Sequence, residues 1–376
     1  MYFWKSKLRK KRVLIGSLTE DNYSPITTIT RAFISSEVLN KKYEFIPHYA
    51  IRKYGKAHTG EFNLVNLWYL IKHFVSWCKK IIIYRPDIAH YPITSYWNLE
   101  KSLLFLKIAG ILGAKKVGQL HGGAFIDFWN KIGKIRRENN LKELNKLDVL
   151  IVSSSYWERM LREQCGIKTK IEIVPNPINR IFESKAIKFN KHNGKTILYV
   201  GRIDIRKGVL DIIESANLVL NSIECRFLLV GGVQKKDDLN KSKNLIKKYK
   251  LENEVNITSQ IAEETKIELF KEALIFLLPS YTENFPLVII EAAAAGLPII
   301  ATPVGALPEF FKHNESIIFI EPGNVNQIAK AIEDLINDES KRERLARGAR
   351  EVFLSKLSRN EIMFSLDKVY QKALVE

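Results

Sequence analysis

Residues 195–213 read "KTILYVGRIDIRKGVLDII", which is a β-rich apolar run, a loop bounded by two glycines and a second apolar segment. A short apolar run followed by a longer amphipathic segment is typical of a βα unit in a parallel sheet. The stretch therefore predicts a strand over residues 195–202 and a helix that begins near Gly208.

The same alternation recurs along the whole chain. Because 376 residues are too many for one ordinary hydrophobic core, it predicts an α/β protein with two doubly wound parallel-sheet domains. Further strands are expected at 12–18, 88–93, 115–123, 147–154, 225–232, 253–259, 274–280 and 297–305. The expected domains are 1–183 and 184–355, followed by a terminal helix at 356–376 that packs back on the N-terminal domain.

The composition, 46% hydrophobic and 27% charged, is that of an ordinary globular protein. Cys78, Cys165 and Cys225 lie far apart with no C-x-x-C pair, which argues for a reducing compartment and against a structural zinc site. The N-terminal basic cluster follows an apolar stub, the reverse of the order in a signal peptide, and the apolar stretches are interrupted too early for a spanning helix. We therefore expect a cytoplasmic or peripheral protein.

The net charge of +18 is unevenly distributed. Up to Arg180 there are 31 Lys and Arg against 14 Asp and Glu, a balance of +17, and the remainder has 28 against 27, a balance of +1. The first half therefore suits an anionic surface or partner, although solvated lysine faces alone would give the same balance.

Two cations follow the strand at 195–202. In open α/β sheets ligands bind at the carboxyl ends of the strands, and Arg202 and Lys207 near a helix N-terminus suit a diphosphate. The first βα turn lacks a G-x-G-x-x-G fingerprint, which argues against a nicotinamide dehydrogenase, and the chain has no Walker A loop.

Two glutamates bound the segment "ENFPLVIIE", residues 283–291. Glu283 is expected in a loop, Pro286 in the first helical turn and Glu291 well inside the helix. This spacing does not suit two carboxylates that flank one glycosidic bond, so the glutamates are expected to bind different ends of one elongated ligand.

A histidine ends a strand in the first half. His121 lies in "GQLHGGAF", residues 118–125, where two glycines let a ligand approach the backbone. A histidine at a strand end is often a satisfied structural residue, but here it is expected to face the cleft reached by Arg202, Lys207 and Glu283.

Over essentially its whole length the chain resembles the family-4 retaining glycosyltransferases, glycosyl transferases group 1. The resemblance rests on the order and spacing of "VPNPI" (174–178), "GRIDIRKG" (201–208), "ENFPLVIIE" (283–291) and "TPVGALPE" (302–309). It implies the GT-B arrangement of two Rossmann-like domains that face a central cleft. It also implies a UDP- or GDP-linked sugar as donor substrate, with no other cofactor.

The resemblance also implies roles for individual residues. Arg202 and Lys207 would hold the donor diphosphate, Glu291 would accept hydrogen bonds from the ribose, and Glu283 would bind hydroxyls of the donor sugar. His121 would contact the sugar near the reacting centre, so His121 and Glu283 are the predicted catalytic residues. The backbone near the donor would come from Asn284, Phe285, Pro286, Leu287 and Val288.

Two positions depart from the family pattern. Gly16 is assigned to the binding site, although the family often has a Gly-Gly turn there and this chain has one glycine. Asn284 stands where the family commonly has glycine, and asparagine tolerates a left-handed backbone better than most residues.

The chemistry implied by the resemblance is metal-independent transfer of a hexosyl-type sugar with retention. Arg, Lys and helix-end amides would stabilise the charge that develops on the leaving diphosphate. The chain has no D-x-D motif, so no metal ligand is assigned. Retention is attributed in the family to same-face attack, in which the leaving phosphate accepts the acceptor proton.

Residues 62–80, "FNLVNLWYLIKHFVSWCKK", predict a helix on the acceptor side. Its apolar face comprises Leu64, Leu67, Trp68, Ile71, Phe74, Val75 and Cys78. That face either packs on the domain's own sheet or contacts an anionic membrane surface, because lysines and aromatic residues border it. We expect a glycan acceptor, lipid-linked and used in cell-surface polysaccharide assembly, with the enzyme peripheral at the inner face of the cell membrane.

Three alternatives stay open. A soluble acceptor would need no membrane contact. A nucleotide-sugar epimerase of the same architecture would rearrange the donor without consuming an acceptor. A nucleic-acid-binding module would explain the basic charge, but no recognised RNA or DNA motif is present, so we expect no nucleic-acid partner.

Overall fold

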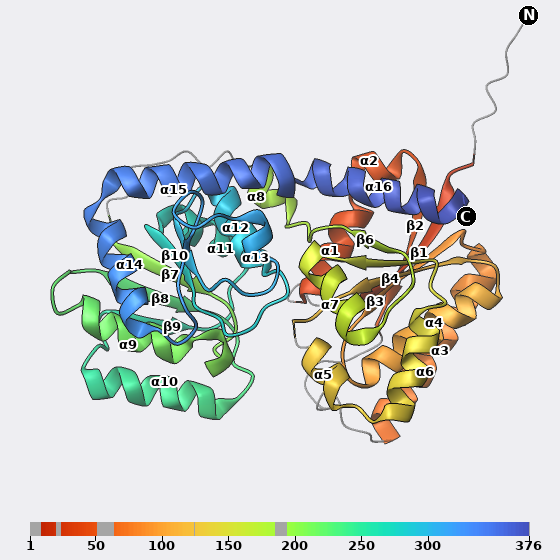
Figure 1. The fold of residues 1–376 in the computed structure, drawn as a ribbon, viewed down its shortest axis with the longest axis horizontal. Helices are drawn as coiled ribbons and strands as arrows, with labels where there is room; N and C mark the ends of the chain where they lie inside the picture. Colours follow the sequence, from red (N-terminus) through yellow and green to blue (C-terminus); the bar gives the residue numbers. More distant parts are fainter. Residues whose placement is uncertain (1–8, 20–23, 51–63, 124, 185–193, 376) are drawn as a thin grey trace, which may run out of the picture. The chain divides into compact units, whose positions relative to one another are not determined.

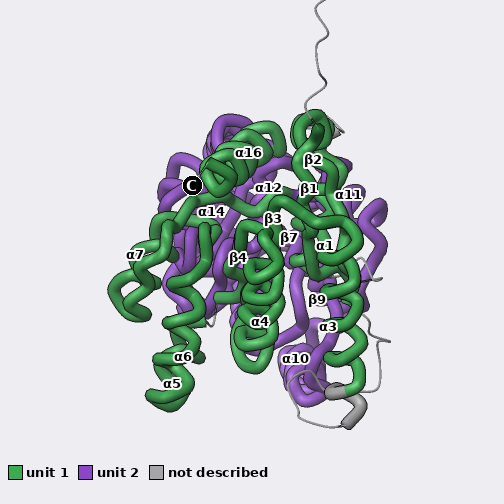
Figure 2. Tube along the Cα trace, turned by 90° about the vertical axis from the view of Figure 1, so that its right-hand side faces the viewer, with its two compact units in different colours: residues 1–177, 359–376 green, residues 178–358 purple. Residues whose placement is uncertain are grey.

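The computed structural model describes residues 9–19, 24–50, 64–123, 125–184 and 194–375. The chain divides into two units, which Figure 2 shows in different colours. Unit 1 comprises residues 1–177 and 359–376, and unit 2 comprises residues 178–358. The boundaries expected from the sequence were 183/184 and 355/356.

In the described part of unit 1, six parallel strands are ordered β2-β1-β3-β4-β5-β6 (Figure 1). The central strands β3 and β5 are buried at every position, as expected for a parallel sheet covered by helices. The strands are β1 Lys11–Leu18, β2 Tyr43–Tyr49, β3 Ile88–Ile93, β4 Lys115–Leu120, β5 Val149–Val152 and β6 Ile171–Ile173. The helices are α1 Pro25–Ile34, α2 Glu37–Asn40, α3 Leu64–Tyr84, α4 Trp97–Ile111, α5 Phe125–Lys131, α6 Lys134–Leu144, α7 Ser155–Cys165 and α16 Arg359–Val375.

The described part of unit 2 has a second parallel sheet, in the order β12-β11-β10-β7-β8-β9. Its strands are β7 Thr196–Val200, β8 Arg226–Val230, β9 Val255–Thr258, β10 Ile275–Leu278, β11 Ile299–Ala301 and β12 Ile318–Phe319. The helices are α8 Arg180–Ser184, η1 Ile205–Lys207, α9 Val209–Val219, α10 Lys236–Tyr249, α11 Glu263–Glu272, α12 Leu287–Ala295, α13 Leu307–Phe310, α14 Val325–Asn337, α15 Glu339–Val352 and the π-helical turn η2 Phe353–Leu357. The prediction of two doubly wound parallel sheets is confirmed.

All nine expected strands are present, and the sequence missed β2, β6 and β12. Each missed strand lies at an edge of its sheet. Strand β2 contains Pro47, which an edge strand tolerates, whereas β6 and β12 have three and two residues. Their short or interrupted apolar patterns explain why they were missed.

The predicted helix at 62–80 is observed as α3, and of the two interpretations of its predicted apolar face, packing on the sheet is wrong. His73, Trp77 and Ile81 are at most 5% exposed, whereas Ile71 and Val75 are 53% and 57% exposed. The Trp77 indole donates to the Phe105 carbonyl of α4 over 2.9 Å, and this bond fixes the rotation of the helix. Because α3 is apolar on two sides, its periodicity could not decide which side is buried.

Some residues of the helix predicted at 62–80 lie outside the part of the chain that the structure describes. Phe62 and Asn63 lie outside the described residues, as do the side chains of Leu64, Asn66 and Leu67. Among the described helices, α3 included, none combines the length and the apolar character needed to cross a membrane.

The terminal helix α16 belongs to unit 1. Its buried Arg359 donates to the Ala32 carbonyl of α1 over 2.5 Å and to Ser35 Oγ over 2.8 Å. Farther along, Asp367 accepts from Lys42 Nζ over 2.5 Å and from the Tyr43 hydroxyl over 2.8 Å. These polar bonds explain why the last residues of the chain return to the unit that contains the first.

We expect Arg359→Ala to lower the free energy of unfolding by about 2–3 kcal/mol, because the buried Ala32 carbonyl loses a charged donor and the bond to Ser35 is also lost. The control is Lys368→Ala, which removes an exposed cation from the same helix and should change stability by less than about 0.5 kcal/mol. Urea unfolding followed by circular dichroism measures both. Equal stability of the two variants would contradict the assigned anchoring role.

Candidate functional site

The carboxyl ends of the unit 2 strands bring together most of the predicted binding residues. Gly208 makes this possible, because its φ of +75° and missing side chain let the β7–α9 loop pack against the end of β10. A Cβ atom at Gly208 would lie 2.3 Å from the Pro279 carbonyl oxygen, so any other residue would push the two loops apart.

The resulting contact joins Lys207 to Glu283. The Lys207 Nζ lies 2.5 Å from Glu283 Oε1, and both side chains are largely buried. Ser280 Oγ donates to the same carboxylate oxygen over 3.0 Å. Since an ammonium has three N–H donors, Lys207 can bind a ligand oxygen while it still contacts Glu283.

Arg202 follows β7 on an exposed part of the same edge. Its Nη1 donates to the side-chain oxygen of Gln234, beyond the end of β8, over 2.6 Å, and the Tyr199 hydroxyl donates to the Arg202 carbonyl over 2.6 Å. Arg202 and Lys207 therefore both lie at the carboxyl edge of one sheet, as the sequence predicted.

Glu291 lies in the second turn of α12 and is 2% exposed. Its Oε1 accepts from Lys266 Nζ of α11 over 2.9 Å, and Lys266 also contacts Glu263 Oε1 over 2.9 Å. Burial raises the pKa of Glu291, an effect that the charge of Lys266 opposes. Burial lowers the pKa of Lys266, but the two carboxylates outweigh it and the pKa is raised.

Glu291 Oε2 has no hydrogen-bond partner among the described atoms. Because a buried carboxylate oxygen normally accepts a hydrogen bond, this atom is a candidate acceptor for a ligand hydroxyl. The sequence missed Lys266, since a lysine one turn after Glu263 on an ordinary helix gives no sign that it is buried.

The segment between the two glutamates is held by packing. Phe285 is buried, and its ring centroid lies 4.7 Å from that of Phe310. The Asn284 carbonyl accepts from Ala306 N over 2.8 Å, and the φ of Asn284 is not positive, so no left-handed residue is needed there. Pro286 caps α12 instead of opening its first turn, and Leu287 and Val288 begin the helix.

In unit 1, His121 follows the last residue of β4, and Gly16 lies two residues before the end of β1. The His121 amide donates to the Ile93 carbonyl over 2.8 Å, and burial lowers the pKa of its imidazole to about 4. The ring is therefore neutral near pH 7. A Cβ atom at Gly16 would lie 2.7 Å from the Tyr91 ring, which explains the glycine. That His121 shares a cleft with Lys207 stays a prediction.

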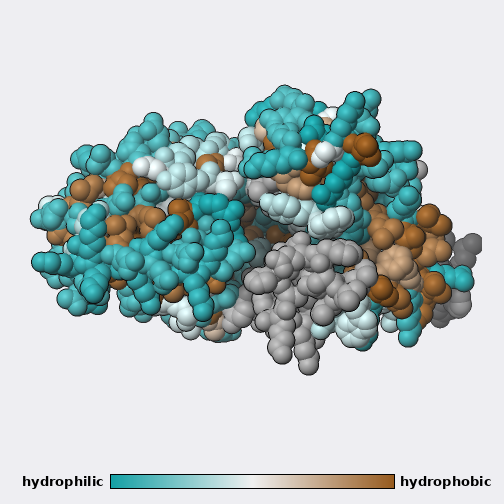
Figure 3. All heavy atoms as spheres, turned by 90° about the horizontal axis from the view of Figure 1, so that it is seen from below, coloured by the Kyte–Doolittle hydropathy of each residue, from teal (hydrophilic) through white to brown (hydrophobic). Residues whose placement is uncertain are grey.

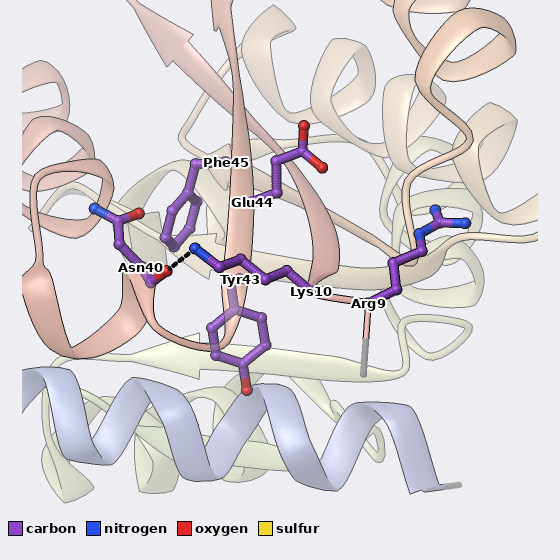
Figure 4. A pocket seen from close by; sticks show the side chains of 6 residues that line it. All are labelled: Arg9, Lys10, Asn40, Tyr43, Glu44 and Phe45. Carbon is purple, nitrogen blue, oxygen red and sulfur yellow. Dashed lines mark hydrogen bonds between the residues drawn. The ribbon is translucent and has the colours of Figure 1, made fainter. Parts of the chain in front are cut away.

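A shallow depression lies elsewhere on unit 1 (Figure 4). It is lined by Arg9, Lys10, Asn40, Tyr43, Glu44 and Phe45, and Lys10 Nζ donates to the Asn40 carbonyl over 2.6 Å. These residues adjoin the amino ends of β1 and β2, opposite the edge that carries Gly16 and His121.

Among the described residues, no group of three or more His, Cys, Asp or Glu is placed to hold a metal ion.

Two family models match consecutive parts of the chain. Glycosyltransferase Family 4 matches residues 35–180, and Glycosyl transferases group 1 matches residues 181–352. The chain belongs to glycosyltransferase family 4. The two sheets are therefore the Rossmann-like domains of a GT-B glycosyltransferase, and the predicted family is confirmed.

Curated relatives of this family-4 chain include the capsular polysaccharide biosynthesis glycosyltransferase CapM of Staphylococcus aureus, 27% identical over 61% of the chain and 62% of the relative. An uncharacterized glycosyltransferase of Methanocaldococcus jannaschii is 27% identical over 62% of each chain. The matches thus span about six tenths of the length of these relatives.

Solved structures show the same fold. Sucrose-phosphate synthase from Thermosynechococcus elongatus superposes with a TM-score of 0.77 at 19% identity, covering 98% of this chain and 100% of that one. Anabaena HepE, solved with UDP and glucose, superposes with a TM-score of 0.73 at 16% identity, covering 96% of this chain and 100% of that one.

Replacing Lys266 with methionine is expected to cost about 3–5 kcal/mol of stability, because the buried Glu291 would lose its counter-charge. The control is Lys271→Met on the same helix, where the exposed pair with Glu268 contributes less than about 1 kcal/mol. Adding Glu291→Gln to Lys266→Met should recover part of the loss. Denaturant unfolding of the four proteins tests this, and equal effects of the two lysine substitutions would contradict it.

Proposed function

We propose that the chain is a retaining glycosyltransferase that moves a sugar from a nucleotide sugar to a glycan acceptor. The observation that carries the proposal is the meeting of Arg202, Lys207, Glu283 and Glu291 at the carboxyl edge of the unit 2 sheet. Two cations and a buried carboxylate with an unpartnered oxygen at this edge suit a ligand that has both a diphosphate and hydroxyls.

In this proposal the two cations bind the diphosphate. Arg202 can bind two phosphate oxygens through its guanidinium, and Lys207 acts as a point charge beside it. Glu291 Oε2 accepts from the ribose, and Glu283 binds hydroxyls of the donor sugar. The solved HepE complex with UDP and glucose supports a nucleotide-sugar donor on this fold. UDP and GDP share the groups assigned here, so either base fits.

The same residues account for the chemistry. As the nucleoside diphosphate departs, negative charge develops on its oxygens, and Arg202 and Lys207 stabilise that charge most in the transition state. Lys207 can then exchange part of its contact with Glu283 for the leaving phosphate. In the proposal the neutral imidazole of His121 bonds the donor sugar, and transfer of the hexosyl-type sugar requires no metal.

We further propose a lipid-linked glycan acceptor in cell-surface polysaccharide assembly, at the inner face of the cell membrane. CapM, a relative by sequence, supports a polysaccharide product. A soluble acceptor is the second candidate, because the matched proteins also include a mannosylfructose-phosphate synthase from Agrobacterium fabrum. Nucleotide release that depends on added acceptor separates either transferase from a nucleotide-sugar epimerase.

We expect Arg202→Ala/Lys207→Ala to lower acceptor-dependent turnover by at least about 10²-fold while the protein stays folded, since each lost donor typically costs about 2.7–4 kcal/mol in the transition state. A matched control is Lys195→Ala/Arg226→Ala, which removes the same charges from exposed positions at the amino edge of the same sheet. Release of UDP or GDP from a panel of donors is the assay. Near wild-type turnover in the first variant would refute the donor site.

A further inference from the structure

Helices α3 and α4 both expose an apolar stripe. On α3 the stripe comprises Trp68, Ile71, Val75 and Ile82, and on α4 it comprises Leu104 and Ile111. These six side chains, here called the α3–α4 patch, are 43% to 70% exposed. Positions three, four and seven apart lie on one side of a helix, so the apolar residues of each stripe share one side, together with the exposed Lys79 on α3 and Lys107 on α4.

The two stripes point the same way. Figures 1 and 2 show α3 and α4 side by side on one face of the unit 1 sheet. On each helix the patch residues lie opposite the buried side, which is Trp77 and Ile81 on α3 and Phe105 and Ala109 on α4. The apolar surface on unit 1 at the right of Figure 3 lies where Figure 1 draws these helices.

Basic residues lie beside and among the apolar residues of the patch. Lys72 and Lys79 are exposed one turn after Trp68 and Val75, and α3 contains no acidic residue. The Lys72 Nζ lies 3.6 Å from the centroid of the Trp68 ring. Large apolar side chains beside lysines on a helix match the pattern of helices that lie in the headgroup region of a membrane.

We propose that the α3–α4 patch binds the surface of an anionic lipid bilayer, with both helices parallel to the membrane plane. The apolar side chains enter the boundary between headgroups and acyl chains, and Lys72 and Lys79 bind lipid phosphates. A second copy of the chain suits the patch less well. A two-fold contact through α3 would bring the α3 lysines of both copies together, with no acidic residue on either copy of α3 to pair with them.

This inference gives a surface to the membrane attachment that the proposed function needs for a lipid-linked acceptor. It does not depend on donor chemistry, because none of the patch residues lies at the donor site. Vesicles without donor or acceptor therefore test it separately, and its failure would leave a transferase with a soluble acceptor intact.

The experiment is co-sedimentation of the full chain with vesicles of phosphatidylcholine alone or mixed with phosphatidylglycerol, at low and high salt. The test variant is Ile71→Asp/Val75→Asp. Its control is Leu354→Asp/Phe364→Asp, which adds the same charge at residues 54% and 52% exposed, against 53% and 57% for the test pair. The equal charge isolates the contribution of the patch.

We expect wild type to prefer the anionic vesicles and to bind them less at high salt, where surface attraction is screened. The test variant should lose about tenfold or more in partitioning, whereas the control keeps most of it. Equal loss in both variants, or no preference of wild type for anionic vesicles, would overturn the proposal.

A second pair of variants keeps the test valid if the first fails to fold. Lys72→Glu/Lys79→Glu should weaken binding to anionic vesicles more than Lys241→Glu/Lys248→Glu, which has the same spacing on the exposed side of α10 in unit 2. Sedimentation velocity tests the other occupant. Dimers of wild type that Ile71→Asp/Val75→Asp dissociates, without vesicle binding, would overturn the lipid assignment in favour of a second copy.

Discussion

Gly208 packs against the Pro279 carbonyl, and the position of Lys207 depends on that contact. With no Cβ atom and a φ of +75°, Gly208 lets the loop after β7 reach the loop after β10, so that Lys207 Nζ comes within 2.5 Å of Glu283. Gly305 also allows a close backbone contact, because a Cβ atom there would lie 2.3 Å from the Asn284 carbonyl oxygen. The two glycines hold the segment that carries both candidate ligand-binding glutamates.

Each of these glutamates is paired with a lysine from another element. Glu283, in the loop, contacts Lys207, and Glu291, inside α12, contacts Lys266. Burial makes the two carboxylates different, because the buried Glu291 depends on its lysine to stay charged while Glu283 keeps some contact with solvent. The pairing concentrates charge at the carboxyl edge of the sheet and suits a ligand that has both phosphates and hydroxyls.

The sequence predicted the parts of this arrangement that follow from strand ends. The strands before these residues, β7 and β10, are unbroken apolar runs, so Arg202, Lys207 and Glu283 could be assigned to one edge before their contacts were known. The edge strands β2, β6 and β12 were missed because Pro47 or their short length breaks the pattern. Tertiary packing determines the features that the sequence did not predict. No local pattern marks Lys266 as buried. The hydrogen bond from Trp77 to the Phe105 carbonyl, and not the periodicity, fixes which side of α3 is exposed.

In the proposed donor complex, the carboxyl edge of unit 2 binds a nucleoside diphosphate, with Glu291 on the ribose and Glu283 on the transferred sugar. Calorimetric titration of UDP and GDP into wild type, Glu291→Gln and Glu283→Gln tests it most directly, because neither free nucleotide carries the sugar. We expect Glu291→Gln to weaken binding about tenfold or more, whereas Glu283→Gln should not weaken it, because Lys207 is released toward the phosphates. Equal loss of affinity in both variants, or no binding of either nucleotide to wild type, would contradict it.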